Sequence, residues 1–467
     1  MNDRPMGFGP PGPSDPDDGD ESVGGSSSDP FSELFAGGDP EAMARALQAA
    51  GAGDVDADQV RAMMGQVQKL LSTPGDGGPV NWQLAGDVAR QVVSEHGDAT
   101  VGQAEQRAVD EALRLADTWL TEATTLPAAG ARGLAWSSAE WVEGTKPVWR
   151  RLVEPVAESV ARALSDALAK QIPPELAGPM AASGPGGPGE AMMRQIGGSV
   201  FGLQVGQAIG TLATEVVSGT EIGLPLVEPG VVVLVPAGVA AFGEGLDVPA
   251  DEVRLYLAVR EAARSRLFAH VPWLSAALLG DVEAYARGIA IDTERIESAL
   301  RETDPSDAES MQQALASGLF EPERTPAQQV ALDRLETSLA LLEGWVEVVT
   351  DAAASTLPHA DGLRETVRRR RAIGGPAEQT FSALVGLELR PRRLRDAAAL
   401  WRVIGDTQGI EARDGVWSHP DLMPTAEDLD DPLGYAERRA QADAGSAAVD
   451  AAIEQLLSGE SGPSDPA

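Results

Sequence analysis

A long, mostly apolar segment of the sequence reads Asp251-Glu-Val-Arg-Leu-Tyr-Leu-Ala-Val-Arg-Glu-Ala-Ala-Arg-Ser-Arg-Leu-Phe-Ala-His-Val-Pro-Trp-Leu274. Its pattern predicts one helix, with Asp247 as its cap and acidic residues in its first turn. Pro272 closes the helix, because a residue that precedes proline is pushed out of the α region. Apolar side chains lie on nearly every side, which is typical of a helix buried in a large core. We therefore expect a mainly α-helical protein packed around this stretch.

Two arginines interrupt the apolar surface of this helix. Arg260 and Arg264 are four residues apart and share one face, and Glu261 stands beside them. Buried charge is costly unless it is paired. Glu343 and Glu347, four apart on a later apolar helix, need partners in the same way. We expect bidentate pairs between these arginines and glutamates; the alternative is that the arginines reach a solvated edge and bond nothing specific.

Composition limits the classes of function. The 467 residues carry a net charge of −36, from 36 basic and 72 acidic residues, and their 43% hydrophobic content is enough for a sizeable core. Nucleic acids and anionic membranes need a positive surface, so neither is an expected partner. The absence of cysteine excludes disulfides and thiolate metal sites and suits a reducing compartment. Because no signal peptide is visible and Ile196 to Thr214 is too polar for a membrane span, we expect a cytoplasmic protein.

Shifts in composition predict the organisation of the chain. Residues 1–30 and 458–467 are acidic, Gly/Pro-rich ends without apolar content, and we expect them to be disordered. A Gly/Pro linker at 173–189 separates an N-terminal helical region, 31–172, from a second helical domain, 190–457. The small β element is a strand at 230–236, followed by a loop at 242–246. Further expected features are short helices between 31 and 71, helices at 82–93, 102–124, 281–300 and 326–354, a segment at 138–170 divided by prolines 147 and 155, and a loop-rich segment at 405–431.

A stripe of glycines marks another expected helix. Gly198, Gly202, Gly206 and Gly210 recur at every fourth residue and so lie on one face. Each glycine costs about 1 kcal/mol of helix propensity relative to alanine, so the stripe needs a reason. Close packing against another backbone is the expected reason; a substrate groove beside the helix is the alternative.

The sequence resembles a known family at several places. Arg260-Glu-Ala-Ala-Arg264, followed by Leu267-Phe268 and Val271-Pro-Trp-Leu274, resembles the H-E-x-x-H helix of a mostly actinobacterial family of zincin-like proteins, labelled hydrolases or zinc-dependent metallopeptidases. The resemblance extends over most of residues 80–435 and makes 190–457 a zincin-like helical domain. It is carried by the glycine-striped helix, the strand that ends at Pro236, and the segments Trp141 to Trp149, Val153 to Ala157, Leu342 to Asp351, Gly386 to Arg392 and Val416 to Pro424.

The motif departs from the family pattern at its metal ligands. In H-E-x-x-H the histidines bind zinc and the glutamate activates the metal-bound water. Here Arg260 and Arg264 occupy both histidine positions, while Glu261 keeps the position of the catalytic glutamate. Arginine has no lone pair to give a metal, so we expect neither the family's zinc nor another cofactor. The resemblance offers Glu343 or Glu347 as a third ligand, and His270 has the spacing of a third histidine, but one histidine with carboxylates makes a poor zinc site.

Two functions stay open from the sequence. The chain is either a hydrolase that works through a different ligand set, or a non-catalytic descendant that binds a protein or peptide in the former active-site groove. A serine hydrolase is not favoured, because no Gly-x-Ser-x-Gly turn occurs. A basic island from Arg364 to Arg402 holds ten arginines against four acidic residues. Such an island binds an acidic partner or phosphate, or, more commonly, pairs with acids of the same chain.

Overall fold

The computed structural model of the chain describes residues 78–130, 132–171, 188–288, 325–372, 380–382, 384 and 393–457. All of them belong to one compact unit, Lys69–Ala467. The predicted disordered ends, the short helices between 31 and 71, and residues 173–187 of the predicted linker lie outside the described residues. The region boundaries stay predictions.

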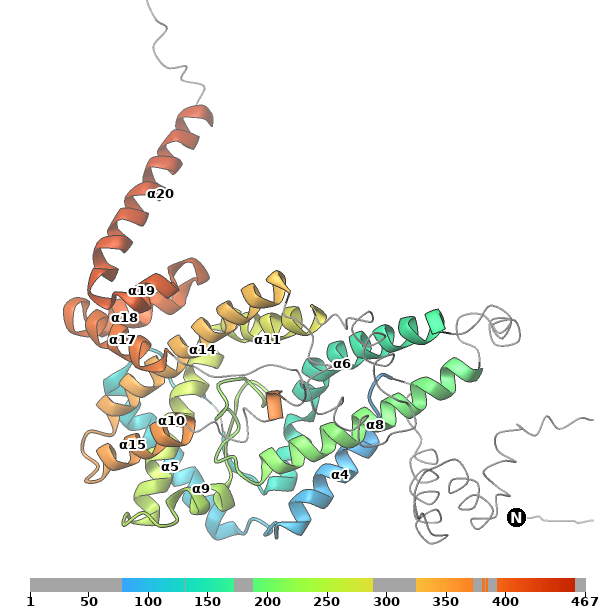
Figure 1. Ribbon diagram of the computed structural model, residues 1–467. Helices are drawn as coiled ribbons and strands as arrows, with labels where there is room; N and C mark the ends of the chain where they lie inside the picture. The colour runs from blue at the N-terminus through green and yellow to red at the C-terminus, as the bar shows by residue number, and fades with distance from the viewer. Residues whose placement is uncertain are drawn as a thin grey trace, which may run out of the picture. The chain divides into compact units, whose positions relative to one another are not determined.

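The described residues form a mainly α-helical fold, as the sequence predicts (Figure 1). Two short strands, β1 (Arg132–Ala135) and β2 (Val231–Leu234), pair in parallel with Arg132 opposite Val231. The longer helices are α4 (Trp82–Glu95), α5 (Gln103–Ala123), α6 (Ser138–Gln171), α8 (Pro188–Ala213), α9 (Pro236–Gly243), α10 (Ala250–His270), α11 (Pro272–Arg287), α14 (Pro326–Ala353), α15 (Ala360–Ala372), α17 (Leu394–Gln408) and α20 (Tyr435–Leu457).

Three local predictions are wrong. The segment expected to be loop-rich holds short helices, α18 (Ile410–Gly415) and α19 (Ala426–Asp430), together with short 3-10 turns. The start of the expected loop at 242–246 belongs to α9. Helix α6 runs unbroken through its prolines. Each interior proline costs about 3 kcal/mol, but α6 packs against α4, α8 and α11 and buries large side chains such as Trp149 and Leu152, which offsets that cost.

Helix α10 is packed on all sides, as its apolar surface predicts. It contacts α5, α14, α9, α11, α15 and β2. The predicted cap is wrong, because Pro249 takes the N-cap position and Asp247 lies two residues outside it. The acidic first turn is present in Asp251 and Glu252. The helix ends at His270, and Pro272 opens α11 as its first residue.

The glycine stripe of α8 lies against the backbone of α4. A Cβ atom at Gly202 would stand 2.6 Å from the carbonyl oxygen of Asn81, and one at Gly206 would stand 2.5 Å from that of Ala85. Both distances are too short for any side chain, so the prediction of close helix packing is confirmed. The alternative of a substrate groove on this face is wrong, because α4 fills it.

A tryptophan cluster holds α14 in place. The ring of Trp417 lies 6.4 Å from Trp273 of α11, 6.4 Å from Trp345 of α14 and 5.4 Å from Trp401 of α17, measured between ring centroids. All but Trp273 are almost fully buried. Tryptophan rings bury large areas and add geometry-dependent contact energy. The cluster therefore fixes α14, which carries Glu343, between two other helices.

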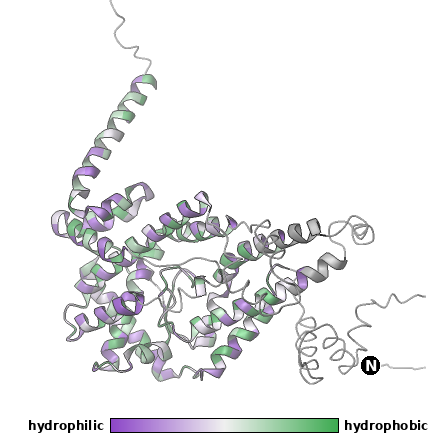
Figure 2. Cartoon of the chain, in the orientation of Figure 1, coloured by the Kyte–Doolittle hydropathy of each residue, from purple (hydrophilic) through white to green (hydrophobic). Residues whose placement is uncertain are grey.

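Hydropathy varies along the helices. Most of them alternate hydrophobic and hydrophilic residues, whereas α15 with its run of arginines is largely hydrophilic (Figure 2). Among the described residues, none of the helices is both long enough and apolar enough to cross a membrane, and α8, which holds most of the segment from Ile196 to Thr214, is no exception.

Candidate functional site

The segment from Arg260 to Arg264 lies in an enclosed part of α10. Arg260 is 4% exposed, Arg264 3% and Glu261 0%. The alternative in which the arginines reach a solvated edge is therefore wrong. Charges enclosed to this degree need partners of opposite sign, and for both arginines that partner is Glu343.

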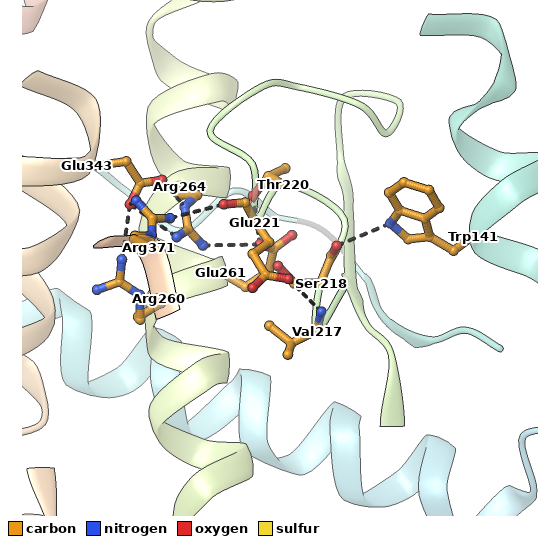
Figure 3. A network of polar contacts seen from close by, with 10 residues as sticks. All are labelled: Trp141, Val217, Ser218, Thr220, Glu221, Arg260, Glu261, Arg264, Glu343 and Arg371. Atoms are coloured by element: carbon orange, nitrogen blue, oxygen red, sulfur yellow. Dashed lines mark hydrogen bonds and ion pairs between the residues drawn. The ribbon is translucent and has the colours of Figure 1, made fainter. Parts of the chain in front are cut away.

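Glu343 of α14 lies between the two arginines (Figure 3). Arg264 donates to it in bidentate fashion, from Nε to Oε1 at 2.7 Å and from Nη2 to Oε2 at 3.1 Å. Arg260 donates from Nη2 to Oε2 at 3.0 Å. The expected pairing of guanidinium and carboxylate is thus present at Glu343, which is itself only 2% exposed.

A third guanidinium group completes this cluster. Arg371, near the end of α15, places Nη1 2.8 Å from Oε2 of Glu343 and donates from Nη2 to the backbone oxygen of Glu221 at 3.0 Å. Burial alone would raise the pKa of Glu343, but the three arginines around it outweigh burial and hold that pKa well below its ordinary value of 4.5. Glu343 is therefore a permanent anion at neutral pH.

Glu261 occupies a different environment from Glu343. Its Oε2 accepts from the Thr220 hydroxyl at 2.6 Å and lies 3.7 Å from Nη1 of Arg264. Its Oε1 is buried and accepts no hydrogen bond within the part of the chain that the structure describes. Burial raises the pKa of Glu261, and the charge of Arg264 only partly opposes that effect. The carboxyl group is therefore held in place, but the nearby positive charge does not fully offset the cost of burying its ionised form.

Glu347, the other expected partner, contacts neither motif arginine. It accepts from Arg368 at 2.6 and 3.1 Å and from Arg402 at 3.0 Å. These arginines come from the basic island, and other members of the island pair with acids as well, namely Arg364, Arg369, Arg370, Arg371 and Arg393. The interpretation that the island pairs within the chain holds for these residues, whereas Arg390 and Arg392 lie outside the described residues.

His270 does not belong to this site. It lies exposed at the last residue of α10, with Nε2 3.2 Å from the backbone oxygen of Ala128. It is six residues beyond Arg264, roughly 9 Å along the helix axis at 1.5 Å per residue. The structure therefore does not bring it together with Glu343.

Sequence reasoning missed Arg371, Thr220 and Ser218. For Arg371, the excess of arginines in the basic island was the available signal, because such an excess indicates that some of these arginines pair with acidic residues elsewhere in the chain. The two hydroxyl residues come from the irregular segment between α8 and β2 and carry no sequence signal of their own. Ser218 is a second hydroxyl residue beside Glu261, and the interaction of its side chain with that carboxyl group opposes the effect of burial on the pKa of Glu261.

The model of the family described as zincin-like metallopeptidase matches residues 80–436. The chain belongs to this family. The matched range includes residues 260–264 of α10.

One solved structure supports the fold independently. It is the crystal structure of "a putative hydrolase with a novel fold" from Chloroflexus aurantiacus, similar to this chain with a TM-score of 0.54 at 17% sequence identity. The similarity covers 77% of this chain and 99% of that one. At this identity the likeness shows a shared fold. A search of curated proteins finds no match.

The residues at the motif do not fit a zinc ion. Zinc needs at least three protein donors with free lone pairs, and guanidinium groups stand at 260 and 264. Both oxygens of Glu343 already accept hydrogen bonds from arginine. Across the parts of the chain that are described, no group of three or more His, Asp or Glu side chains is arranged to hold a metal ion.

Proposed function

We propose that this chain is a non-catalytic member of the zincin-like family, which binds a protein or peptide without cleaving it. The observation that carries the proposal is the engagement of Glu343 by Arg260, Arg264 and Arg371. Positive charge from guanidinium groups takes the place that a metal ion would need. The cluster is closed by short charge-assisted bonds, which are among the strongest polar contacts in proteins.

The surroundings of Glu261 also support this proposal. A glutamate that activates water must reach both the water and the scissile carbonyl. Glu261 is 0% exposed. The pocket on that side of α10 is about 30 Å³, which is room for one or two water molecules and not for a polypeptide. A peptide bond has no path to this carboxyl group in the described structure.

Family membership supports a polypeptide as the ligand, because metallopeptidases act on polypeptides. A larger pocket of about 330 Å³ lies where α5, α9 and the start of α10 meet. Its apolar lining includes Val109, Val239 and Val253. Its size is at the lower end of the range typical of ligand sites, so it suits the apolar side chain of a bound peptide.

A peptide library with a fluorescent label tests binding and cleavage together. The proposal expects peptides that bind by anisotropy, remain intact during long incubation, and bind with unchanged affinity to the Glu261→Gln variant. The competing hydrolase function expects turnover of a bound peptide that Glu261→Gln abolishes, and this result would overturn the proposal.

The double variant R260H/R264H tests what has been lost. It restores both histidine positions beside Glu261 and leaves Glu343 as a third donor. Zinc bound by the double variant at one ion per chain, and not by the unaltered chain, would support loss of ligands at an otherwise retained site. Zinc bound equally by both would refute it.

A further inference from the structure

One arginine of α10 differs from the others in having no carboxylate partner. Arg260, Arg264 and Arg266 all pair with carboxylates of other helices. Arg254, at the start of the second turn, is half-buried, and its guanidinium group makes no ion pair or hydrogen bond with any residue that the structure describes. A charge that is partly withdrawn from water and left unpaired is costly. Arg254 is therefore a group that an anion from outside the chain would stabilise.

Arg254 lines the pocket of about 330 Å³ at the start of α10. Helix α10 contacts α5 and α9, which supply most of the other walls (Figure 1). The lining is apolar or glycine except for Arg254, Glu105 and Glu244. A volume at the lower end of the range for ligand sites suits one large apolar side chain and the backbone next to it, and not a long folded segment.

The two carboxylates of the lining differ in availability. Oε2 of Glu105 accepts from the backbone N–H of Gly102 at 2.7 Å and thereby caps α5. Glu244 directly follows α9, is exposed, and its carboxylate has no partner among the described residues. The chain as a whole carries −36. A ligand that enters beside Glu244 is therefore favoured when it carries positive charge at the rim of the pocket.

The C-terminal end of a polypeptide combines these features. Its α-carboxylate matches the fork of an arginine side chain in geometry and charge. Its last side chain can enter an apolar pocket, because no further chain has to leave the pocket again. A basic residue shortly before the end supplies the positive charge for Glu244. An internal segment has no backbone carboxylate, and the ammonium group of an N-terminus would be repelled by Arg254.

We propose that this pocket binds the C-terminal residue of a polypeptide, with an apolar last side chain inside, the α-carboxylate on Arg254 and a preceding basic residue beside Glu244. The inference rests on the proposed function, because it names the part of the polypeptide that the chain binds. The two fail separately. Equal binding of peptides with free and blocked C-termini refutes this inference alone, whereas cleavage that depends on Glu261 refutes the proposed function.

Fluorescence anisotropy of the full chain with four peptides provides the test. Each peptide carries the fluorophore at its N-terminus. The reference peptide ends in Lys-Ser-Leu with a free carboxylate. The other three differ from it by a C-terminal amide, by serine in place of the leucine, or by glutamate in place of the lysine. Unlabelled octanoate, an apolar carboxylate without a peptide backbone, is the competitor that separates a polypeptide end from a simple apolar acid.

Two variants change the pocket and one serves as the matched control. Arg254→Gln removes the positive charge, and Ala108→Leu places a larger side chain in the wall that α5 provides. Arg107→Gln is the control, because Arg107 is the exposed neighbour of Ala108, does not line the pocket, and donates from Nε to the backbone oxygen of Gln103 in its own helix. Thermal melting checks that each variant is folded.

We expect the reference peptide to bind about tenfold or more tightly than its amide, since charge-assisted hydrogen bonds are the stronger ones. Loss of the leucine should weaken binding by about tenfold, through loss of apolar burial, and glutamate for lysine by several-fold. Arg254→Gln should bind the free acid and the amide equally, and Ala108→Leu should weaken binding of the reference peptide. Arg107→Gln should change affinity by less than twofold.

Three results would overturn the proposal. The first is equal affinity of the unaltered chain for acid and amide, including no binding of either. The second is a preference for the free acid that persists in Arg254→Gln. The third is displacement of the labelled peptide by octanoate at a lower concentration than by the unlabelled reference peptide, which would assign the pocket to simple apolar acids.

Discussion

Arg264 and Glu343 lie 79 residues apart in the chain and share two hydrogen bonds, at 2.7 and 3.1 Å, in a place where neither side chain is more than 3% exposed. This pair joins the motif helix α10 to α14. It also decides the chemistry of the site, since both oxygens of Glu343 are committed to guanidinium groups.

Removal of the Glu343 charge should be strongly destabilising. Glu343→Gln leaves three arginines without their common anion, and breaking a buried ion pair in this way costs about 3–5 kcal/mol. Glu347→Gln is the matched control, one helical turn further along α14. Its partners Arg368 and Arg402 are 27% and 40% exposed, so water can solvate them once the carboxylate is gone. We therefore expect a smaller loss of unfolding free energy, about 1 kcal/mol. Urea unfolding measures both; equal losses would contradict the special role of Glu343.

Acid should destabilise the protein through the same residue. The pKa of Glu343 is lower in the folded chain than its ordinary value of 4.5. The folded state therefore binds fewer protons than the unfolded state in this range, and stability falls as the pH drops below about 4.5. Net repulsion weakens toward the isoelectric point near 4.4 and acts in the opposite direction. Unfolding free energies between pH 6 and pH 3 should thus decline below 4.5, and a flat profile would disagree.

Glu261→Gln should behave in the opposite way. Burial raises the pKa of Glu261, so the folded state binds more protons than the unfolded state above pH 4.5. Its contribution to stability then falls as the pH rises through the folded pKa. The glutamine of the variant does not ionise, so its stability does not fall with pH in this way. Its amide oxygen can still accept the hydrogen bond from the Thr220 hydroxyl. We expect it to match or exceed the unaltered chain in unfolding free energy at pH 8, with a gain that grows with pH. A gain that shrinks with pH would show the sign to be wrong.

The packing of α8 on α4 gives a test of the fold. Gly206→Ala forces a methyl group to within 2.5 Å of the carbonyl oxygen of Ala85, and overpacking of this kind costs about 1–3 kcal/mol. On the same helix, a Cβ atom at Gly197 would meet no other atom within 4 Å, so Gly197→Ala should stabilise by about 1 kcal/mol through helix propensity. Thermal melting of the two variants should shift in opposite directions. Shifts of the same sign would argue against the close contact.

The local sequence pattern predicted the helices and their buried faces better than the side-chain contacts between them. The burial of α10, the glycine contact and the need for partners at Arg260 and Arg264 all follow from spacing and apolar content. Spacing could not separate Glu343 from Glu347, because residues four apart differ in direction by about 40° on a helix of 3.6 residues per turn, enough to face different neighbours. Arg371 could not be assigned either, because its contact with Glu343 depends on how α15 packs against α14, which no local pattern encodes.

The zinc content of the purified, unaltered chain shows whether the arginines around Glu343 exclude a metal ion. The protein is produced in medium supplemented with zinc, freed of loosely bound ions on a desalting column, and analysed for metal per chain. Because Arg260, Arg264 and Arg371 all pair with Glu343 and guanidinium groups do not bind metals, we expect far less than one zinc ion per chain. One zinc ion per chain that survives desalting and is lost in Glu343→Gln would contradict the account.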